Sequence, residues 1–163
     1  MNVTSQETKA GFLGNFRNVS ILFFITRIIM GGMMLEQGLV KLTGGFTARD
    51  FLAYSTGPFS GWYASLIPYT PVFDPLIIWS EILIGIALIS GALVRFVSFC
   101  AAIMMMLFYL AYIPSPAGWV NYQLIYALLF VALLFAGSGY FLGLDRMFYG
   151  LEKKKHPLRF LFG

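Results

Sequence analysis

Apolar residues gather into four long runs along this chain, and short stretches between them carry most of the polar side chains. A membrane-spanning helix needs about 20 mostly apolar residues, and the runs that qualify are residues 19–42, 76–94, 96–113 and 120–142. Only Arg95 separates the second run from the third, which predicts a tight turn there, whereas Pro114 and Pro116 break the chain before the fourth. The pattern predicts an all-α fold, a polytopic membrane four-helix bundle that residues 1–163 form as a single domain.

The longest connection between runs, residues 43–75, is rich in aromatic side chains. Thr47 followed by Asp50 resembles a capping box that opens a short helix, and residues 59–67 fit a second short helix. Aromatic residues between two spans are typical of segments that lie at the membrane interface. We therefore expect a long outward loop with short interfacial helices, and the alternative is a lid over an outward-facing pocket.

Basic residues flank the runs unevenly. Four spans would put both termini and the Arg95 turn on one side, together with the cytoplasmic tail at 143–163. That side carries Lys9, Arg17, Arg95, Arg146, Lys153, Lys154, Lys155 and Arg159, and the other carries only Lys41 and Arg49. Because cytoplasmic loops hold an excess of Lys and Arg, the sequence predicts a multi-pass protein of the cell membrane with both termini cytoplasmic.

The amino-acid composition limits the surroundings, partners and cofactors that the chain can have. The chain is 59% hydrophobic and 11% charged, whereas soluble domains carry about 25% charged residues, so the lipid bilayer is the expected surrounding. The net charge of +4 lies at helix ends and in the tail, which argues against nucleic acid as a partner. A single cysteine, Cys100, and a single histidine, His156, exclude an iron–sulfur cluster, a bis-histidine haem or a metal centre held by this chain alone. Any redox chemistry must therefore come from a bound small molecule or a partner.

Two charged stripes follow the helical period. The first span places residues at spacings of four, three, four and three: Arg27, Gly31, Met34, Gly38 and Lys41. The second span repeats these spacings with Glu81, Gly85, Leu88, Ala92 and Arg95. Since consecutive spans run antiparallel, we expect Lys41 to meet Glu81 at one end of the bundle and Arg27 to meet Arg95 at the other. Asp145 is the nearby anion for those two cations, and the glycines would let the backbones approach closely.

The role of the charged stripes stays open at this point. Ionisable residues inside a membrane are costly and usually pair within the bundle, so the stripes serve either as structural pairs or as part of a site. Glu36 lies off the stripe, about 180° around the helix from Arg27. It is either a protonated packing residue or a proton-handling group beside a ligand. Asn121 and Gln123 lie at the start of the fourth run, where they are expected to cap its helix.

At these residues the sequence resembles the DoxD/DoxX family of four-helix membrane proteins, over about residues 25–148. The resemblance rests on the two charged stripes and on the segments Gly57-Pro58-Phe59 and Gly143-Leu144-Asp145. These two segments favour the DoxD branch. One position departs from the family pattern, because Tyr140 stands where members often carry an arginine after the glycine that corresponds to Gly139.

The resemblance implies a membrane subunit of a thiosulfate dehydrogenase that passes electrons to quinone and forms tetrathionate. It implies quinone as the bound cofactor and a second, DoxA-like membrane-associated subunit or quinol oxidase subunits as partners. On this hypothesis the catalytic residues are Lys41, which attracts an anionic sulfur substrate, and Glu81 or Glu36, which takes up protons. The residues that would bind the quinone are Trp79, Asn121 and Trp62.

Two other classes of function remain. The chain could be a non-catalytic accessory subunit of a terminal quinol oxidase or another respiratory complex, in which case the charged stripes serve helix packing alone. It could also be a small proton-coupled transporter, since one membrane carboxylate such as Glu36 can couple proton movement to export.

Overall fold

The structure is a computed structural model that describes residues 3–114, 118–136 and 143–145, and its regular elements are helices. A long first helix, α1, spans Val3–Thr43. Two short helices follow, α2 at Arg49–Ala53 and α3 at Ser60–Ser65, and then the 3-10 helix η1 at Ile67–Tyr69. The last three helices are α4 at Thr70–Ser90, α5 at Val94–Ala111 and α6 at Tyr122–Ala136.

Three helical segments are long and apolar enough to cross a membrane: Asn18–Thr43, Ile67–Ser90 and Val94–Ala111. They confirm that the first three predicted runs are helices. The second, however, begins earlier than predicted: α4 starts at Thr70, inside the expected loop 43–75, because Pro71 is tolerated in the first turn of a helix, and it ends at Ser90 instead of residue 94. The helix α6 is apolar but has 15 residues in its described part, and the rest of the predicted fourth run, 137–142, lies outside the described residues. Many large apolar side chains on the three long segments are exposed, for example Leu22, Ile29 and Leu83. Such surfaces are expected of helices that face lipid.

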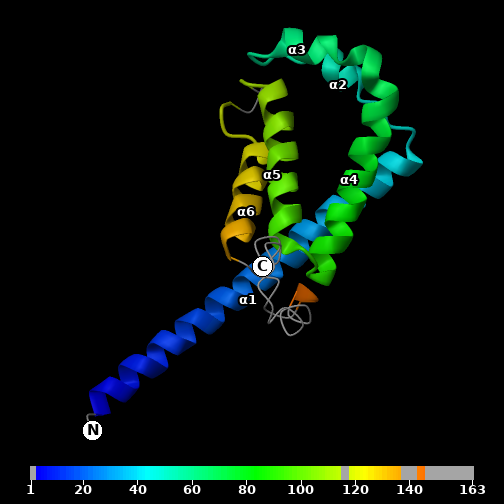
Figure 1. The fold of residues 1–163 in the computed structure, drawn as a ribbon. Helices are drawn as coiled ribbons and strands as arrows, with labels where there is room; N and C mark the ends of the chain where they lie inside the picture. The colour runs from blue at the N-terminus through cyan, green and yellow to red at the C-terminus, as the bar shows by residue number, and fades with distance from the viewer. Residues whose placement is uncertain (1–2, 115–117, 137–142, 146–163) are drawn as a thin grey trace, which may run out of the picture.

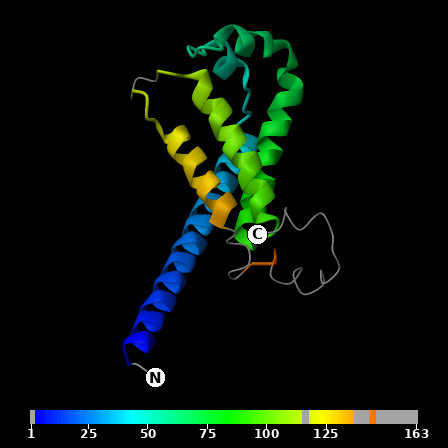
Figure 2. The same cartoon turned by 60° about the vertical axis from the view of Figure 1, so that its left-hand side comes forward.

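The helices form two closely packed pairs. The C-terminal half of α1 runs along α4, and α5 runs along α6. Figure 1 shows that the N-terminal half of α1 extends well beyond the other helices, and the rotated view in Figure 2 agrees. The helices α4 and α5 meet near the turn that joins them and diverge toward the opposite end, which α2 and α3 cover (Figure 1).

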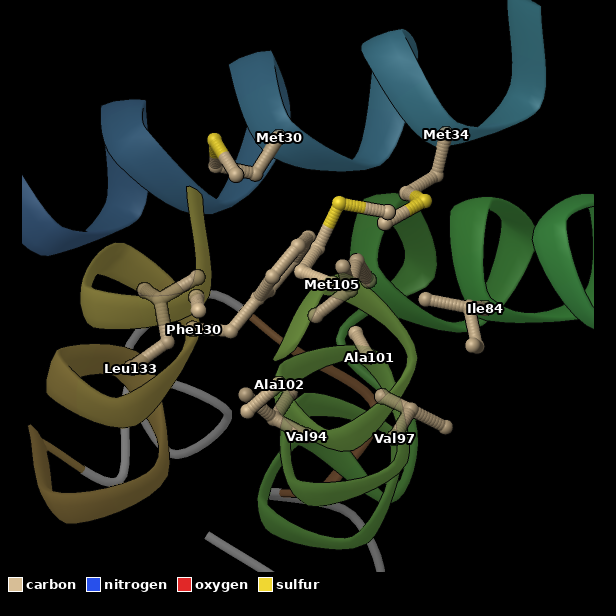
Figure 3. Close-up of a cluster of buried hydrophobic side chains, with 12 residues drawn as sticks. Met30, Met34, Ile84, Val94, Val97, Ala101, Ala102, Met105, Phe130 and Leu133 are labelled. Atoms are coloured by element: carbon tan, nitrogen blue, oxygen red, sulfur yellow. The ribbon is translucent and has the colours of Figure 1, made fainter. Parts of the chain in front are cut away.

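The core lies where the two pairs meet. Phe130 and Leu133 of α6 and Leu88 of α4 are fully buried, as is Val94 of α5, and Met34 of α1 is 1% exposed. Figure 3 shows Met34 of α1 and Met105 of α5 converging near the ring of Phe130, and Met30 belongs to the same cluster. Flexible methionines fill irregular gaps between helices, so this cluster fixes how the two pairs sit against each other.

The turn between α4 and α5 lies earlier than predicted. Gly91 ends α4 in the left-handed conformation at φ 72°, and Leu93 before α5 is also left-handed at φ 51°. Arg95 therefore lies inside α5, and the prediction that it marks the turn is wrong. The physical reason is that glycine adopts a left-handed helix end without the steric cost of a Cβ atom, whereas an arginine only interrupts an apolar run.

Backbone and side-chain hydrogen bonds fasten the segment of α2 and α3 to α4 and α5. The Asp74 carboxylate accepts from the backbone N–H of Ala48 at 2.8 Å, and Gly57 donates its N–H to the carbonyl of Ala111 at 2.9 Å. The predicted capping box does not form, because no side chain caps α2. Thr47 Oγ1 instead accepts from the N–H of Arg49 at 3.3 Å. The two short helices of the expected loop are confirmed.

Tyr63 of α3 forms another hydrogen bond between this segment and α5. It is 4% exposed, and its hydroxyl donates to the carbonyl of Leu107 on α5 at 2.7 Å. Burial raises the pKa of the Tyr63 phenol, so the hydroxyl stays a donor at neutral pH. Tyr63→Phe leaves that carbonyl without its donor and should lower the free energy of unfolding by about 1 kcal/mol. Denaturant titration in detergent micelles measures this.

The exposed tyrosine of α2's C-cap, Tyr54, supplies the matched control. Its side chain is 73% exposed, so Tyr54→Phe should leave the unfolding midpoint unchanged. Equal midpoints for Tyr63→Phe and Tyr54→Phe would mean that the Tyr63 hydrogen bond does not stabilise the fold.

Candidate functional site

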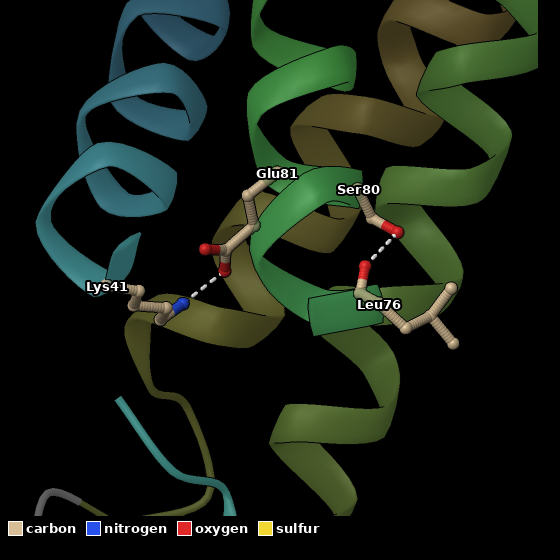
Figure 4. A network of polar contacts seen from close by, with 4 residues as sticks. All are labelled: Lys41, Leu76, Ser80 and Glu81. Atoms are coloured by element: carbon tan, nitrogen blue, oxygen red, sulfur yellow. Dashed lines mark hydrogen bonds and ion pairs between the residues drawn. The ribbon is translucent and has the colours of Figure 1, made fainter. Parts of the chain in front are cut away.

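Lys41 and Glu81 form an ion pair between the end of α1 and the middle of α4. The Lys41 ammonium donates to Glu81 Oε1, and the view in Figure 4 shows the two side chains pointing toward each other. Glu81 is 1% exposed, and the Lys41 side chain is 18% exposed. Removing such charges from water is costly unless they pair. The predicted contact between the two charged stripes at this end is confirmed.

Glycines allow α1 and α4 to approach closely enough for this pair. A Cβ atom on Gly38 would lie 2.9 Å from the backbone nitrogen of Ile82, and one on Gly85 would lie 2.6 Å from that of Leu35. Real Cβ atoms do not approach backbone atoms so closely, so the two helices touch through their backbones at these positions. The predicted close packing along the stripes is confirmed.

The ion pair forms part of the wall of a pocket of about 420 Å³ between α1, α4, α5 and α6. Two aromatic rings lie near the Lys41 ammonium, with the Phe46 centroid at 5.3 Å and the Phe108 centroid at 5.8 Å. The other walls are mostly apolar: Met33, Met34, Ala48, Phe51, Ile77, Met105, Tyr122 and Tyr126. This volume lies within the range of about 300–1,000 Å³ typical of small-molecule sites.

Two buried acceptor atoms belong to residues that line this pocket. Glu81 Oε2 and Gln123 Oε1 have no hydrogen-bond partner among the described residues. Buried polar atoms are nearly always hydrogen-bonded, so an unpaired acceptor calls for an explanation. The pocket thus offers the Lys41 ammonium as a donor and these two buried acceptors beside an aromatic wall, and the amide of Gln37 on α1 also lines it. That arrangement suits a flat ligand with polar groups at its edge.

Sequence reasoning missed the pocket role of Gln123, which was expected to cap α6. The cap expected of Asn121 is confirmed, since its Oδ1 accepts from the backbone N–H of Leu124 at 3.2 Å. Asn121 is 7% exposed and does not line the pocket. The spacing of Tyr122, Gln123 and Tyr126 at the start of the fourth run was the available signal, because these residues line the pocket together.

The other predicted site residues lie elsewhere. Glu36 is exposed on α1 and does not line the pocket. Trp79 of α4 is 54% exposed and is likewise absent from its walls. Trp62 of α3 lines a neighbouring apolar groove instead. The structure therefore brings together Lys41 and Glu81 among these candidates and leaves the others apart from them.

A second buried charge cluster lies at the turn between α4 and α5. Arg27 and Asp145 are both fully buried, and the charge of Asp145 attracts the Arg27 guanidinium. The Asp145 carboxylate also accepts the first N–H groups of α5, from Leu93 at 2.8 Å and Val94 at 3.2 Å. The predicted meeting of Arg27 with Asp145 is confirmed. Arg95 directly follows Val94 in the chain, but its Nε has no hydrogen-bond partner within the described part of the chain.

Backbone hydrogen bonds also connect this second cluster to the helix that precedes it. Backbone N–H groups of Leu144 and Asp145 donate to the carbonyls of Ser90 and Gly91, at 3.2 and 3.0 Å. The segment after α6 is thereby fixed to the end of α4. Among the described residues, no group of His, Cys, Asp and Glu side chains is arranged to hold a metal ion.

The long apolar helices and the buried ion pair beside an aromatic pocket define an all-helical membrane protein with a candidate small-molecule site. The DoxX family model matches residues 22–113, over half of the 163 residues. The chain therefore belongs to the DoxX family. The matched region contains both charged stripes and the α1, α4 and α5 walls of the pocket. Comparison with curated proteins and with solved structures gives no significant match.

Proposed function

We propose that this protein is the membrane subunit of a quinone-linked oxidoreductase and that the pocket beside Lys41 and Glu81 binds the quinone head. The observation that carries the proposal is the buried carboxylate of Glu81, whose second oxygen has no partner among the described residues. Membership of the DoxX family supports it further. A flat ring would lie among Phe46, Phe51 and Phe108, with its carbonyl oxygens within reach of polar side chains.

The residues of the pocket suit proton transfer to such a ring. When bound, a quinone accepts two electrons and two protons and leaves as the quinol. The Lys41 ammonium can donate a hydrogen bond to a carbonyl oxygen of the ring, which favours the build-up of negative charge there. Glu81 can hold a proton at Oε2 and pass it to the reduced oxygen. The aromatic and methionine walls would pack against the faces of the ring.

For the electron donor we propose thiosulfate. Two thiosulfate ions join through a new S–S bond to give tetrathionate, which releases the two electrons that quinone requires. The proposal is supported by the resemblance of Gly57-Pro58-Phe59 and Gly143-Leu144-Asp145 to the DoxD branch. The positive charge of Lys41 near the end of α1 would attract the anion.

This choice of donor predicts a strong effect of Lys41. In membranes that hold the intact complex, Lys41→Met should lower thiosulfate-dependent quinone reduction by about tenfold or more, since a charged partner of the substrate is lost. The exposed cation Arg49 on α2 lies outside the pocket, and Arg49→Met should leave the rate unchanged. Tetrathionate formation is the measurement. Equal loss in both variants would contradict a role for Lys41 in the site.

The orientation that we propose puts both termini in the cytoplasm and the Lys41 end of the bundle outside. It is supported by the uneven distribution of Lys and Arg between the two sides of the predicted spans. The segment of α2 and α3, with the pocket beneath it, would then face the outside. An anionic sulfur compound could reach Lys41 from there without crossing the bilayer.

We further propose that a second subunit covers the face of α1 that carries Glu36. This carboxyl is exposed in the segment Asn18–Thr43, and a charge there costs about 2.5–3.5 kcal/mol in lipid unless it finds a partner. Glu36→Leu should weaken the association with the partner subunit, and co-purification from mild detergent measures this. Leu42 is 47% exposed on α1 and lies about 120° around the helix from Glu36, so Leu42→Ile offers the control. Loss of the partner in both variants, or in neither, would contradict this surface. An accessory subunit without catalytic function would show the same association but no tetrathionate formation.

A further inference from the structure

A second cavity, an apolar groove of about 680 Å³, lies where α4 and α5 diverge beneath α2 and α3 (Figures 1 and 2). Its lining includes Leu83 and Leu76 of α4, which are 61% and 57% exposed, and Ile103 of α5, which is 47% exposed. Because these exposed side chains belong to segments long enough to cross a membrane, the groove is open toward lipid.

The hydroxyl groups in this groove are already hydrogen-bonded to the backbone. Ser80 donates to the carbonyl of Leu76 at 2.6 Å, as Figure 4 shows, and Tyr63 donates to that of Leu107. The remaining lining is almost entirely aliphatic and aromatic. A polar ligand would gain no hydrogen bond from these hydroxyls, so the groove suits a hydrocarbon chain.

The groove and the pocket of the ion pair share one wall. Ala48, Phe51, Ile77 and Phe108 line both cavities. At their junction the Phe51 and Phe108 rings contact each other edge to face, with centroids 5.4 Å apart. A ligand with a polar ring and an apolar chain could therefore occupy both cavities while passing these two side chains.

Neighbouring residues of α4 show how the two cavities differ. Glu81 lines the pocket and Ser80 lines the groove, since consecutive side chains on a helix point about 100° apart. One turn earlier, Ile77 borders both cavities. The same helix thus presents an acid to one cavity and an apolar surface to the other.

We propose that this groove holds the isoprenoid tail of a membrane quinone whose head lies in the pocket beside Lys41 and Glu81. The inference rests on the proposed function and deepens it, because it assigns the substrate to long-tailed quinones that enter from the bilayer between α4 and α5. The residues that line both cavities give a way to tell this tail from the chain of an ordinary lipid. A tail that is tethered to a head in the pocket must leave beside Phe51 and Phe108, and a lipid chain has no such constraint.

The test measures where the tail lies rather than how tightly it binds. Lipid chains are as apolar as the groove, so the tail gains little affinity by leaving the bilayer. The purified full chain is placed in phosphatidylcholine nanodiscs with a benzoquinone whose first isoprene unit carries a photoreactive diazirine. After illumination, mass spectrometry should find the label on groove residues of α4 and α5. An excess of unlabelled long-tailed quinone should remove it.

Two variants of neighbouring residues on α5 sharpen the test. Cys100 lines the groove, whereas Phe99 is 51% exposed and does not. Cys100→Trp fills the groove and should abolish most of the labelling, while a tail-less benzoquinone still binds. Phe99→Trp introduces the same residue type at a position outside the groove, about 100° around the helix, and should leave the labelling pattern unchanged.

The possible results distinguish a failure of the proposed tail site from a failure of the proposed quinone pocket. Label spread evenly over lipid-facing positions, Phe99 among them, would overturn the tail groove. If Glu81→Gln still weakens binding of the tail-less benzoquinone in that case, the proposed function stands. Groove labelling that persists when Glu81 is replaced would mean that an untethered chain fills the groove, which also overturns the proposal. Failure of the tail-less benzoquinone to bind the native chain would overturn the proposed function itself.

Discussion

Replacing Glu81 by leucine should lower quinone reduction by the intact complex by about 100-fold or more, the range over which a positioned acid–base group contributes to a rate. The same change leaves the Lys41 ammonium beside the pocket without its partner. Breaking a buried ion pair in this way costs about 3–5 kcal/mol. We therefore expect both the rate and the detergent resistance of the protein to fall.

Further variants separate chemistry from folding. Glu81→Gln keeps an oxygen acceptor for Lys41 but exchanges no proton, so it should retain most of the stability while losing the rate. The double variant with Lys41→Met and Glu81→Leu removes both charges and should recover the stability without the rate. Asp50 is an exposed acid of α2 outside the pocket, and Asp50→Asn should behave as the native protein. A Glu81→Gln variant with native turnover would contradict the proton-transfer role of this residue.

Replacing Gly85 by valine should destabilise the protein by at least about 3 kcal/mol, at the upper end of the cost of overpacking. The added Cβ would lie 2.6 Å from the backbone nitrogen of Leu35 and 2.8 Å from the carbonyl oxygen of Gly31. Neither atom can move without moving α1 itself. The helices must separate, and the contact between Lys41 and Glu81 is stretched with them. The fraction that remains folded during titration with dodecyl sulfate measures the loss.

A glycine of α1 provides the control for this prediction. Nothing lies within 4 Å of a Cβ atom placed on Gly32, in contrast to its neighbour Gly31. Gly32→Val carries the same change of residue type and the same change of helix propensity, so it should cost less than Gly85→Val. If both variants unfold at the same dodecyl sulfate fraction, close backbone contact does not determine the stability of this pair of helices.

The charged stripes were predictable because helical period alone decides which residues share a face. Arg27 and Lys41 had to point the same way as Gly31 and Gly38, and antiparallel neighbours then brought Glu81 to Lys41. The same period explains why Arg27, Met34 and Glu81 are buried together, since each lies on the face where α1 and α4 pack against each other. The three long apolar runs were predictable from length and hydropathy, since the bilayer sets both.

The full set of residues that line the pocket could not be predicted, because it depends on contacts between segments far apart in the chain. Its walls combine Met33 of α1, Phe108 of α5 and Gln123 of α6. Which of these side chains reach one another depends on how far α5 tilts from α4. That tilt starts at the left-handed residues Gly91 and Leu93, and hydropathy alone carries no signal for it. Trp79 was assigned to the site from residue type, although its place on the helix faces it outward.

Cys100 has a practical value that follows from its position. It is the only cysteine in the chain, and it is partly buried in the wall of the apolar groove. A nitroxide attached to this sulfur would serve as a reporter at a natural position, with no other residue altered. Because the label itself would occupy the groove, the ligand to add is the tail-less benzoquinone, and changes in the spectrum would then report how α5 shifts against α4 when the pocket is filled.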